Sequence, residues 1–419
     1  MSDYFPIPNA KRFDLLKEPV PVRWYLRPIV WLLSFPVFWA HRSKIVTNDM
    51  QGVKPPYILL CSHNAFYDFM VATVATFPHQ AYYIVAVDGF IGREWLMRGV
   101  GCIGKRKFTN DISIIRHLKG VLDRGKIAAF YPEARYSLCG TNAVLPESLG
   151  KMIKLFNVPV ATLITHGHHI DAPFWKGVNP KSRMLRTTSE KKLILTADDV
   201  KNLSVDEINK RINEAFYYDD FKWQKENKVR VKSKKRAEGL EHVLYKCPHC
   251  GTEYRMSTKG TILSCGHCCH EWEMSEYGEL KAVKGESHFT HIPDWYEWQR
   301  ECIRKEVEAG TYSLDVPCKI KSLPNSKGFI NVGEGQLVHS MDGFSLRSDW
   351  KGTEWKLDIP TSALYSVHIE YNYKVEHRDC IDLSTLSETF FVYPKGSEFS
   401  VTKISLATEE LFKNYWSNR

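Results

Sequence analysis

Between residues 57 and 216, short apolar segments alternate with amphipathic ones, and this alternation constrains the fold more than any other feature. The apolar segments have the near-continuous hydrophobicity of strands buried on both faces, and they cover residues 57–63, 81–87, 126–133, 158–167 and 191–196. The stretches 68–77, 109–125 and 148–156 have helical periodicity. Strands that alternate with helices predict an α/β domain around a mixed, mostly parallel sheet.

Eleven cysteines occur in the chain, and four of them form two CxxC pairs. Cys247 pairs with Cys250 and Cys265 pairs with Cys268, with 14 residues between the pairs. Each CxxC turn presents two thiolates, and two such turns form a closed tetrahedral site, so the spacing predicts a structural zinc ion in a ribbon. Cys269 is a less well-spaced substitute for Cys268. The other cysteines do not resemble a disulfide framework, which indicates a reducing, cytoplasmic compartment.

The C-terminal quarter has a different pattern, in which apolar residues alternate with period two between glycine and asparagine turns. This pattern predicts antiparallel strands, and the helical period of residues 406–416 predicts a closing helix. Such an arrangement is similar to a pleckstrin-homology (PH) domain. At 419 residues the chain is too long for one hydrophobic core. We predict an α/β domain with an N-terminal interfacial segment at 1–225, a basic linker at 226–242, a zinc ribbon at 243–284, a connecting helix at 285–310 and a β-rich domain at 311–419.

An apolar segment with basic flanks covers residues 22–44. Its apolar part, residues 28–40, is shorter than the roughly 20 residues that a membrane-spanning helix needs. Arg23, Arg27 and Lys44 flank it, and several tryptophans lie between them. Such a segment is typical of a helix in the membrane interface; the alternative is a helix packed on the protein's own core. We expect a peripheral or monotopic protein on the inner, cytoplasmic face of a membrane.

His63 and Asp68 directly follow the first predicted strand, in the sequence SHNAFYD. Regular helix or strand geometry would keep their side chains apart. They meet only if the chain turns between them, with Asp68 at the start of a helix. An aspartate that accepts the imidazole N–H leaves the other ring nitrogen as a general base. The pair predicts removal of a proton from a hydroxyl group, and a structural helix cap is the alternative.

Charged residues follow two other segments. GCIGKRKF (101–108) places Arg106 and Lys107 after glycines, and cations at such a flexible turn suit a phosphate group. YPEARY places Glu133 and Arg135 at the carboxyl end of a predicted strand, where open α/β sheets bind ligands. These four residues are candidates for binding substrate; a solvated basic loop and a surface ion pair are the alternatives.

Three histidines, His166, His168 and His169, lie at the end of another predicted strand. A cysteine or carboxylate at ligand spacing does not accompany them. We therefore expect loop histidines rather than a second metal site.

These motifs occur in a characteristic order: His-x-x-x-x-Asp, a glycine-then-cation block, a Pro-Glu block and a Val-Pro-Val strand at 158–160. Together they resemble the four blocks of the glycerolipid acyltransferase family, which includes bacterial 1-acylglycerol-3-phosphate acyltransferases. The resemblance covers about residues 25–225. It departs from the family pattern in the third block, where the usual Glu-Gly-Thr-Arg is replaced by Glu133-Ala134-Arg135-Tyr136.

The resemblance implies an O-acyltransferase with His63 as general base, Asp68 as its orienting partner and Arg106 as a ligand of the acceptor phosphate. It also implies an acyl-CoA or acyl-carrier-protein donor and a lysophospholipid acceptor such as 1-acylglycerol-3-phosphate at the membrane surface. A non-catalytic scaffold that binds lipid or a partner protein is the alternative. The net charge of +9 and the ribbon are compatible with nucleic acid, but the β-rich domain lacks a nucleic-acid motif, so we favour lipid or protein.

Overall fold

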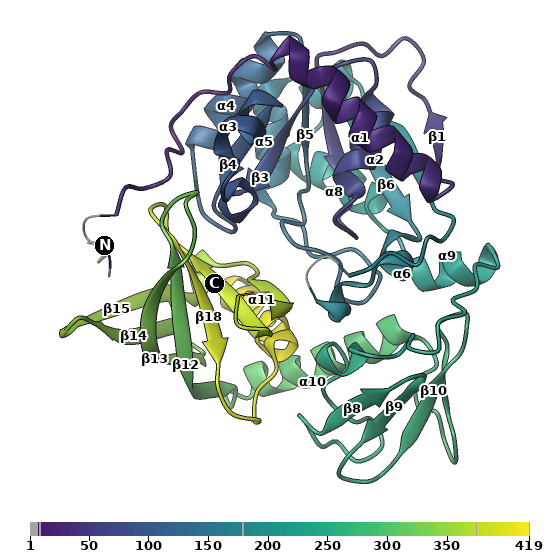
Figure 1. Cartoon of the computed structure of the whole chain (residues 1–419), viewed down its shortest axis with the longest axis vertical. Helices are drawn as coiled ribbons and strands as arrows, with labels where there is room; N and C mark the ends of the chain where they lie inside the picture. Colours follow the sequence, from purple (N-terminus) through teal and green to yellow (C-terminus); the bar gives the residue numbers. More distant parts are fainter. Residues whose placement is uncertain (1–6, 8–9, 178–179, 374, 419) are drawn as a thin grey trace.

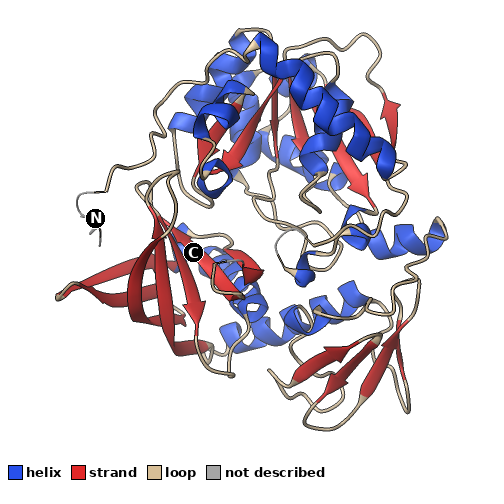
Figure 2. Cartoon of the chain, viewed as in Figure 1, coloured by secondary structure: helices blue, strands red, loops and turns tan. Residues whose placement is uncertain are grey.

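The computed structural model describes residues 7, 10–177, 180–373 and 375–418. Within these residues the chain forms a seven-stranded α/β sheet, a four-stranded antiparallel sheet and a second seven-stranded sheet, in that order (Figures 1 and 2). Helix α10 (Ile292–Glu308) runs between the two antiparallel sheets, beneath the α/β part in this view.

The first sheet consists of β1 Lys44–Asn48, β2 Tyr57–Cys61, β3 Ala81–Ala86, β4 Cys102–Lys105, β5 Ile127–Phe130, β6 Val160–His166 and β7 Thr188–Leu195. Their spatial order is β1-β7-β6-β2-β5-β3-β4. The strands from β6 to β4 in that order run parallel, whereas β7 pairs antiparallel with β6 and parallel with β1. This confirms the predicted α/β class with a mixed, mostly parallel sheet.

The helices of this part are α1 Arg27–Ala40, α2 Asp68–Thr76, α3 Glu94–Gly99, α4 Ser113–Asp123, α5 Ser148–Phe156, α6 His168–Asp171, α7 Ala197–Asn202, α8 Val205–Ala215 and α9 Asp220–Glu226. Short 3-10 helices cover Trp24–Leu26, Val87–Phe90 and Phe174–Lys176. Successive side chains of a strand point to opposite faces, and both faces of β2 are buried. Ile58 and Leu60 belong to one core with residues of α4, α5 and α8, whereas Leu59 and Cys61 belong to another core that includes α2.

One local prediction in this part was wrong. Residues 102–105, expected as a flexible turn, form the edge strand β4, which pairs with β3. The helical stretch between Val205 and Glu226 is divided into α8 and α9. The division occurs because the Asp219 side chain accepts hydrogen bonds from the N–H groups of Phe221 and Lys222, and thus caps a new helix.

The four-stranded sheet follows the basic segment 226–242. Its strands are β8 Met256–Lys259, β9 Ile262–Cys265, β10 Glu271–Met274 and β11 Leu280–Ala282, and a 3-10 helix at Leu240–His242 precedes them. The basic segment is anchored rather than free, because Val231 and Ala237 are buried and the Val231 N–H donates to the Glu276 carbonyl. Trp272 packs on Trp295, with ring centroids 4.9 Å apart, so this sheet shares a core with the next helix.

The second large sheet consists of β12 Ser313–Leu323, β13 Ile330–Ser340, β14 Gly343–Trp350, β15 Thr353–Pro360, β16 His368–Tyr373, β17 Arg378–Ser384 and β18 Thr389–Pro394. Helix α10 Ile292–Glu308 precedes it, a 3-10 helix covers Thr361–Ala363, and α11 Val401–Ser417 closes it. The order is β15-β14-β13-β12-β18-β17-β16, and all pairs are antiparallel. This is the predicted order of strands and closing helix; the likeness to a PH domain stays a prediction.

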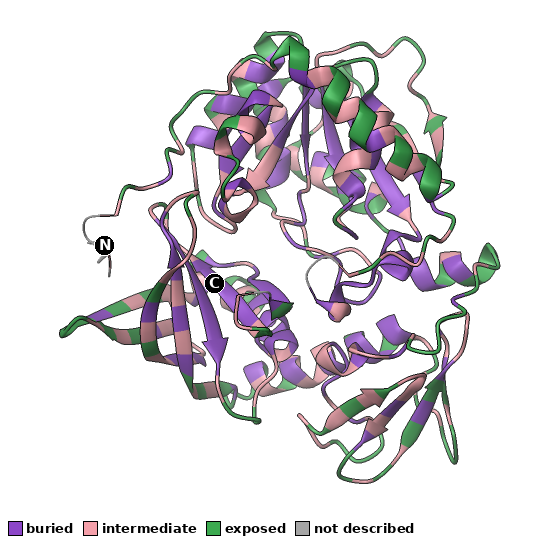
Figure 3. Cartoon of the chain, in the orientation of Figure 1, coloured by how far each residue is buried: buried purple, intermediate pink, exposed green. Residues whose placement is uncertain are grey.

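Much of helix α1 is exposed (Figure 3), and its exposed residues include large apolar side chains. Ser34 is its buried residue, whereas Leu32 is 72% exposed and Trp39 is 66% exposed. Among the helices of the described residues, none is long and apolar enough to span a membrane.

Candidate functional site

His63 and Asp68 meet at the carboxyl end of β2. The chain leaves β2 at Cys61 and turns, and α2 then begins at Asp68. This turn brings His63 Nδ1 to 3.2 Å from Asp68 Oδ2. Asp68 Oδ2 also accepts the N–H groups of Asn64 at 2.6 Å and Ala65 at 2.9 Å, so the carboxylate holds the turn together.

The carboxylate of Asp68 is buried but ionised. It is 1% exposed, and burial alone would raise its pKa. Hydrogen bonds from His168 and His63 outweigh this effect and lower the pKa to about 2. An ionised Asp68 accepts the Nδ1–H of His63 and leaves the Nε2 lone pair available as a base.

The backbone and ring of His63 are both held in place. Its N–H donates to Glu133 Oε2 at 2.9 Å, and its carbonyl accepts the Ser137 N–H at 2.8 Å. Its ring lies against Tyr131 and Tyr136, with centroids 4.3 and 4.0 Å away. These contacts leave little rotational freedom to the imidazole, which favours a single orientation of the ring.

His168 is a third member of this arrangement and was not predicted. Its Nδ1 lies 2.5 Å from Asp68 Oδ1, and its side chain is fully buried at the start of α6. Asp68 thus binds one histidine through each carboxylate oxygen. The structure brings His168 to Asp68 because β6 and β2 are parallel neighbours, and residues that follow such strands meet at one sheet edge. The sequence alone does not show which strands are neighbours.

Replacing His168 by alanine is expected to raise the pKa of Asp68, because a hydrogen bond that stabilises the carboxylate is lost. If His63 acts as the predicted base, its activity needs ionised Asp68. As the pH falls, the variant should therefore lose activity at a higher pH than the unaltered protein, and its kcat should be about tenfold lower. The pH profile of the variant checks this expectation. His169→Ala is the matched control, because His169 is equally buried but packs on Trp175. An unshifted acid limb in His168→Ala would contradict the assigned role.

A large cavity lies beside the histidine. Its volume is about 1280 Å³, and His63 is part of its wall. Most lining side chains are apolar, including Leu33 of α1, Met152 of α5 and Tyr365 from the segment between β15 and β16. Since ligand pockets for small molecules usually occupy about 300–1,000 Å³, this cavity has room for an extended hydrocarbon chain.

The four predicted substrate-binding residues are engaged in contacts within the protein. Arg106 is buried and donates to the carbonyls of Leu323, Pro324 and Ser387 and to the Thr389 hydroxyl. These acceptors belong to the β-rich part, so the guanidinium joins two parts of the chain instead of facing the cavity.

Lys107, Glu133 and Arg135 have equally specific partners. Lys107 contacts Asp382 at 3.0 Å, and Arg135 contacts Glu409 at 2.8 Å. Glu133 is buried, and its carboxylate accepts backbone N–H groups, including that of His63. Burial raises the pKa of Glu133 to about 7. Lys107 and Arg135 line the cavity, whereas Glu133 supports the histidine from behind. Their substrate-binding roles stay predictions.

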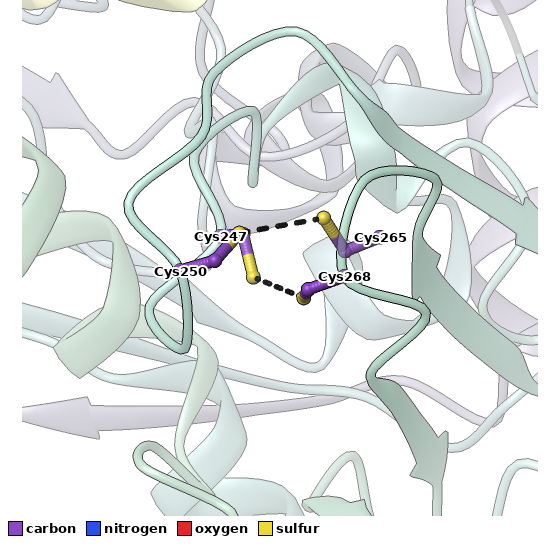
Figure 4. A group of neighbouring side chains, drawn as sticks. All are labelled: Cys247, Cys250, Cys265 and Cys268. Atoms are coloured by element: carbon purple, nitrogen blue, oxygen red, sulfur yellow. Dashed lines mark hydrogen bonds between the residues drawn. The ribbon is translucent and has the colours of Figure 1, made fainter.

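The four predicted cysteine ligands come together in the small sheet (Figure 4). The Sγ atoms of Cys247 and Cys268 are 3.8 Å apart, as are those of Cys250 and Cys265. All four Sγ atoms lie within 4.8 Å of one another. The cluster could hold a metal ion and contains Cys268 rather than the exposed Cys269.

Comparison with known proteins finds a similarity among solved structures but none among family models or curated proteins. The chain matches no model of a known protein family and no curated protein. Among solved structures, it is similar to the crystal structure of the 1-acyl-sn-glycerophosphate (LPA) acyltransferase PlsC from Thermotoga maritima, at 17% identity over 46% of this chain and 77% of that chain. The TM-score is 0.35, which is too low to carry an argument about activity.

Proposed function

We propose that this protein is an O-acyltransferase that moves a fatty acyl group from a thioester to the hydroxyl of a lysophospholipid. One observation carries the proposal: an imidazole oriented by a buried, ionised carboxylate forms part of the wall of a large apolar cavity. A base beside a chain-sized apolar space suits a reaction between a lipid hydroxyl and an acyl group.

The chemistry follows from the geometry of His63. Its Nε2 takes the proton of the acceptor hydroxyl as the oxygen attacks the thioester carbon, and Asp68 stabilises the imidazolium that forms. The new C–O bond forms, the C–S bond breaks, and the imidazolium returns the proton to the leaving thiolate. An acyl-CoA or acyl-carrier protein supplies the thioester.

The exposed face of α1 supports action at a membrane surface. Ile29 and Leu33 line the cavity, and they are exposed, as are Leu32 and Trp39 on the same helix. A lipid could therefore pass from the interface along α1 into the cavity. Leu32→Glu should weaken binding to phospholipid vesicles in a sedimentation assay, and unchanged binding would exclude α1 as the contact.

Zinc is the metal that suits the cysteine cluster. A tetrahedron with metal–sulfur bonds of about 2.3 Å has sulfur–sulfur edges of about 3.8 Å, and two Sγ pairs lie 3.8 Å apart. Four thiolate ligands leave no open coordination position, so the ion would stabilise the fold and take no part in the reaction.

Acceptor-dependent loss of thioester absorbance tests the proposed activity. Purified protein is mixed with acyl-CoA, with and without a panel of lysolipids in detergent micelles. We expect consumption of the thioester to depend on a lysolipid. No consumption with any acceptor would favour the non-catalytic alternative, which the internal pairing of Arg106 and Arg135 also favours.

A further inference from the structure

Two tyrosine rings pack on the imidazole of His63, and the proposed reaction uses neither hydroxyl. The ring centroid of Tyr131 lies 4.3 Å from that of His63, and the ring centroid of Tyr136 lies 4.0 Å from it. Both tyrosines belong to the segment that follows β5, which is a parallel neighbour of β2, and both line the cavity. The parallel pairing therefore brings two phenols to the base at the carboxyl edge of the sheet.

The two hydroxyls differ in their surroundings. The hydroxyl of Tyr131 is enclosed by protein and has no hydrogen-bond partner among the described residues. The hydroxyl of Tyr136 also has no partner in the described part of the chain, but it is not enclosed. Because Tyr136 is partly buried and lines the cavity, its hydroxyl lies at the cavity surface, where a ligand can reach it.

The phenol of Tyr136 is a fixed hydrogen-bond donor. Its ring also contacts Phe174, at a centroid distance of 5.0 Å. The next residue, Ser137, donates its N–H to the His63 carbonyl at 2.8 Å, which anchors the chain beside the base. Burial raises the pKa of Tyr136, so the phenol keeps its proton near neutral pH. A donor held in this way needs little reorganisation when a substrate arrives.

The reaction needs a donor that the neighbouring backbone does not offer. When the acceptor hydroxyl attacks the thioester, negative charge develops on the carbonyl oxygen, and enzymes stabilise such charge with fixed hydrogen-bond donors. The N–H groups of residues 62–65, in the turn after β2, all donate to acceptors within the protein. The side-chain amide of Asn64 does the same, and the cations Lys107 and Arg135 are held in ion pairs. The hydroxyl of Tyr136 is a donor beside the base that no described residue occupies.

We infer that Tyr136 is a catalytic residue, whose hydroxyl donates a hydrogen bond to the thioester carbonyl oxygen as negative charge develops there. This inference rests on the proposed acyl transfer. As the acceptor oxygen forms the new C–O bond, the electron pair of the carbonyl π bond moves onto the oxygen, and the phenol proton stays on Tyr136 throughout. When the C–S bond breaks, that electron pair re-forms the carbonyl of the new ester. The hydrogen bond is strongest while the oxygen carries the charge, so it lowers the barrier.

Removal of the hydroxyl alone tests this role. Tyr136→Phe keeps the ring contacts with His63 and Phe174, and because the hydroxyl has no partner in the described part of the chain, thermal unfolding should match that of the unaltered protein. We expect kcat to fall about 100-fold and KM for acyl-CoA to change little, since the hydrogen bond forms mainly in the transition state. Tyr131→Phe is the matched comparison, because it removes an enclosed hydroxyl beside the same imidazole, and its kcat should fall far less.

Two unreactive analogues of acyl-CoA report on the same hydrogen bond without turnover. One carries a trifluoromethyl ketone in place of the thioester, and this ketone hydrates to a tetrahedral centre. The other is an alkyl thioether of the same chain length, which has no carbonyl oxygen. In calorimetry, Tyr136→Phe should bind the ketone about tenfold more weakly than the unaltered protein does, and should bind the thioether equally well.

The outcomes separate the role of Tyr136 from the proposed reaction. Full kcat in Tyr136→Phe, equal losses of kcat in Tyr131→Phe and Tyr136→Phe, or equal weakening for both analogues would overturn the role and leave the acyltransferase proposal standing. If no acceptor causes consumption of the thioester, selective loss of ketone binding in Tyr136→Phe would support the hydroxyl as a donor to the tetrahedral oxygen and contradict the reaction. Binding of neither analogue to the unaltered protein would overturn both.

Discussion

Replacing His63 by alanine is expected to lower kcat/KM for acyl transfer about 1,000-fold, within the range that general bases contribute. The decrease should be in kcat, with KM little changed, because the imidazole acts when the hydroxyl is deprotonated and contributes little to binding the lipid chain. Steady-state kinetics with acyl-CoA and the preferred lysolipid measure both constants.

The folded state should tolerate this change, since the His63 side chain is 21% exposed at the cavity wall. Thermal unfolding of the variant is expected to match that of the unaltered protein within a few degrees. His79→Ala, at an exposed position after α2, is the control and should retain full activity. If His63→Ala turned over at the rate of the unaltered protein, His63 would not be the general base.

Replacing Cys265 by serine is expected to have the largest effect on stability. Structural zinc contributes binding free energy on the order of 10 kcal/mol to folding, and Cys265 is buried at the end of β9. Because Trp272 of the same sheet packs on Trp295 of α10, the damage should extend beyond the four-stranded sheet. We expect one zinc per chain by plasma mass spectrometry in the natural protein, its loss in the variant, and a lower melting temperature.

Cys269→Ser is the matched control for this experiment. Cys269 is adjacent to the cluster but exposed and not part of it. The Cys269→Ser variant should therefore retain zinc and the melting temperature of the unaltered protein. If Cys269→Ser lost zinc while Cys265→Ser kept it, the ligand set would be wrong.

The fold was predictable where apolar segments were long and continuous. The core strands β2, β3, β5 and β6 lie within predicted segments because burial on both faces requires unbroken apolar runs. The edge strand β4 was not recognised, since its four residues, CIGK, are too short for a periodic signal. Strand β1 was missed for a similar reason, because it is an edge strand with exposed Lys44 and Thr47.

The candidate site was predictable only where its residues are close in sequence. The turn between His63 and Asp68 could be predicted, because the two residues are five positions apart and directly follow a predicted strand. The link from Asp68 to His168 joins segments far apart in sequence, and a single sequence carries no pairing information for such a contact. The partners of Arg106 and Lys107 could not be predicted for the same reason, because Thr389 and Asp382 belong to the β-rich sheet.

The central claim is direct transfer of the acyl group to a lipid hydroxyl, with His63 as base and no covalent intermediate on the protein. Mass spectrometry after incubation with isotope-labelled acyl-CoA and a lysolipid tests it most directly, by following the label in both the lipids and the intact protein. The account predicts a labelled diacyl lipid and an unmodified protein mass at every time point. Absence of the labelled lipid, or an acyl-protein adduct that turns over on the way to it, would contradict the account.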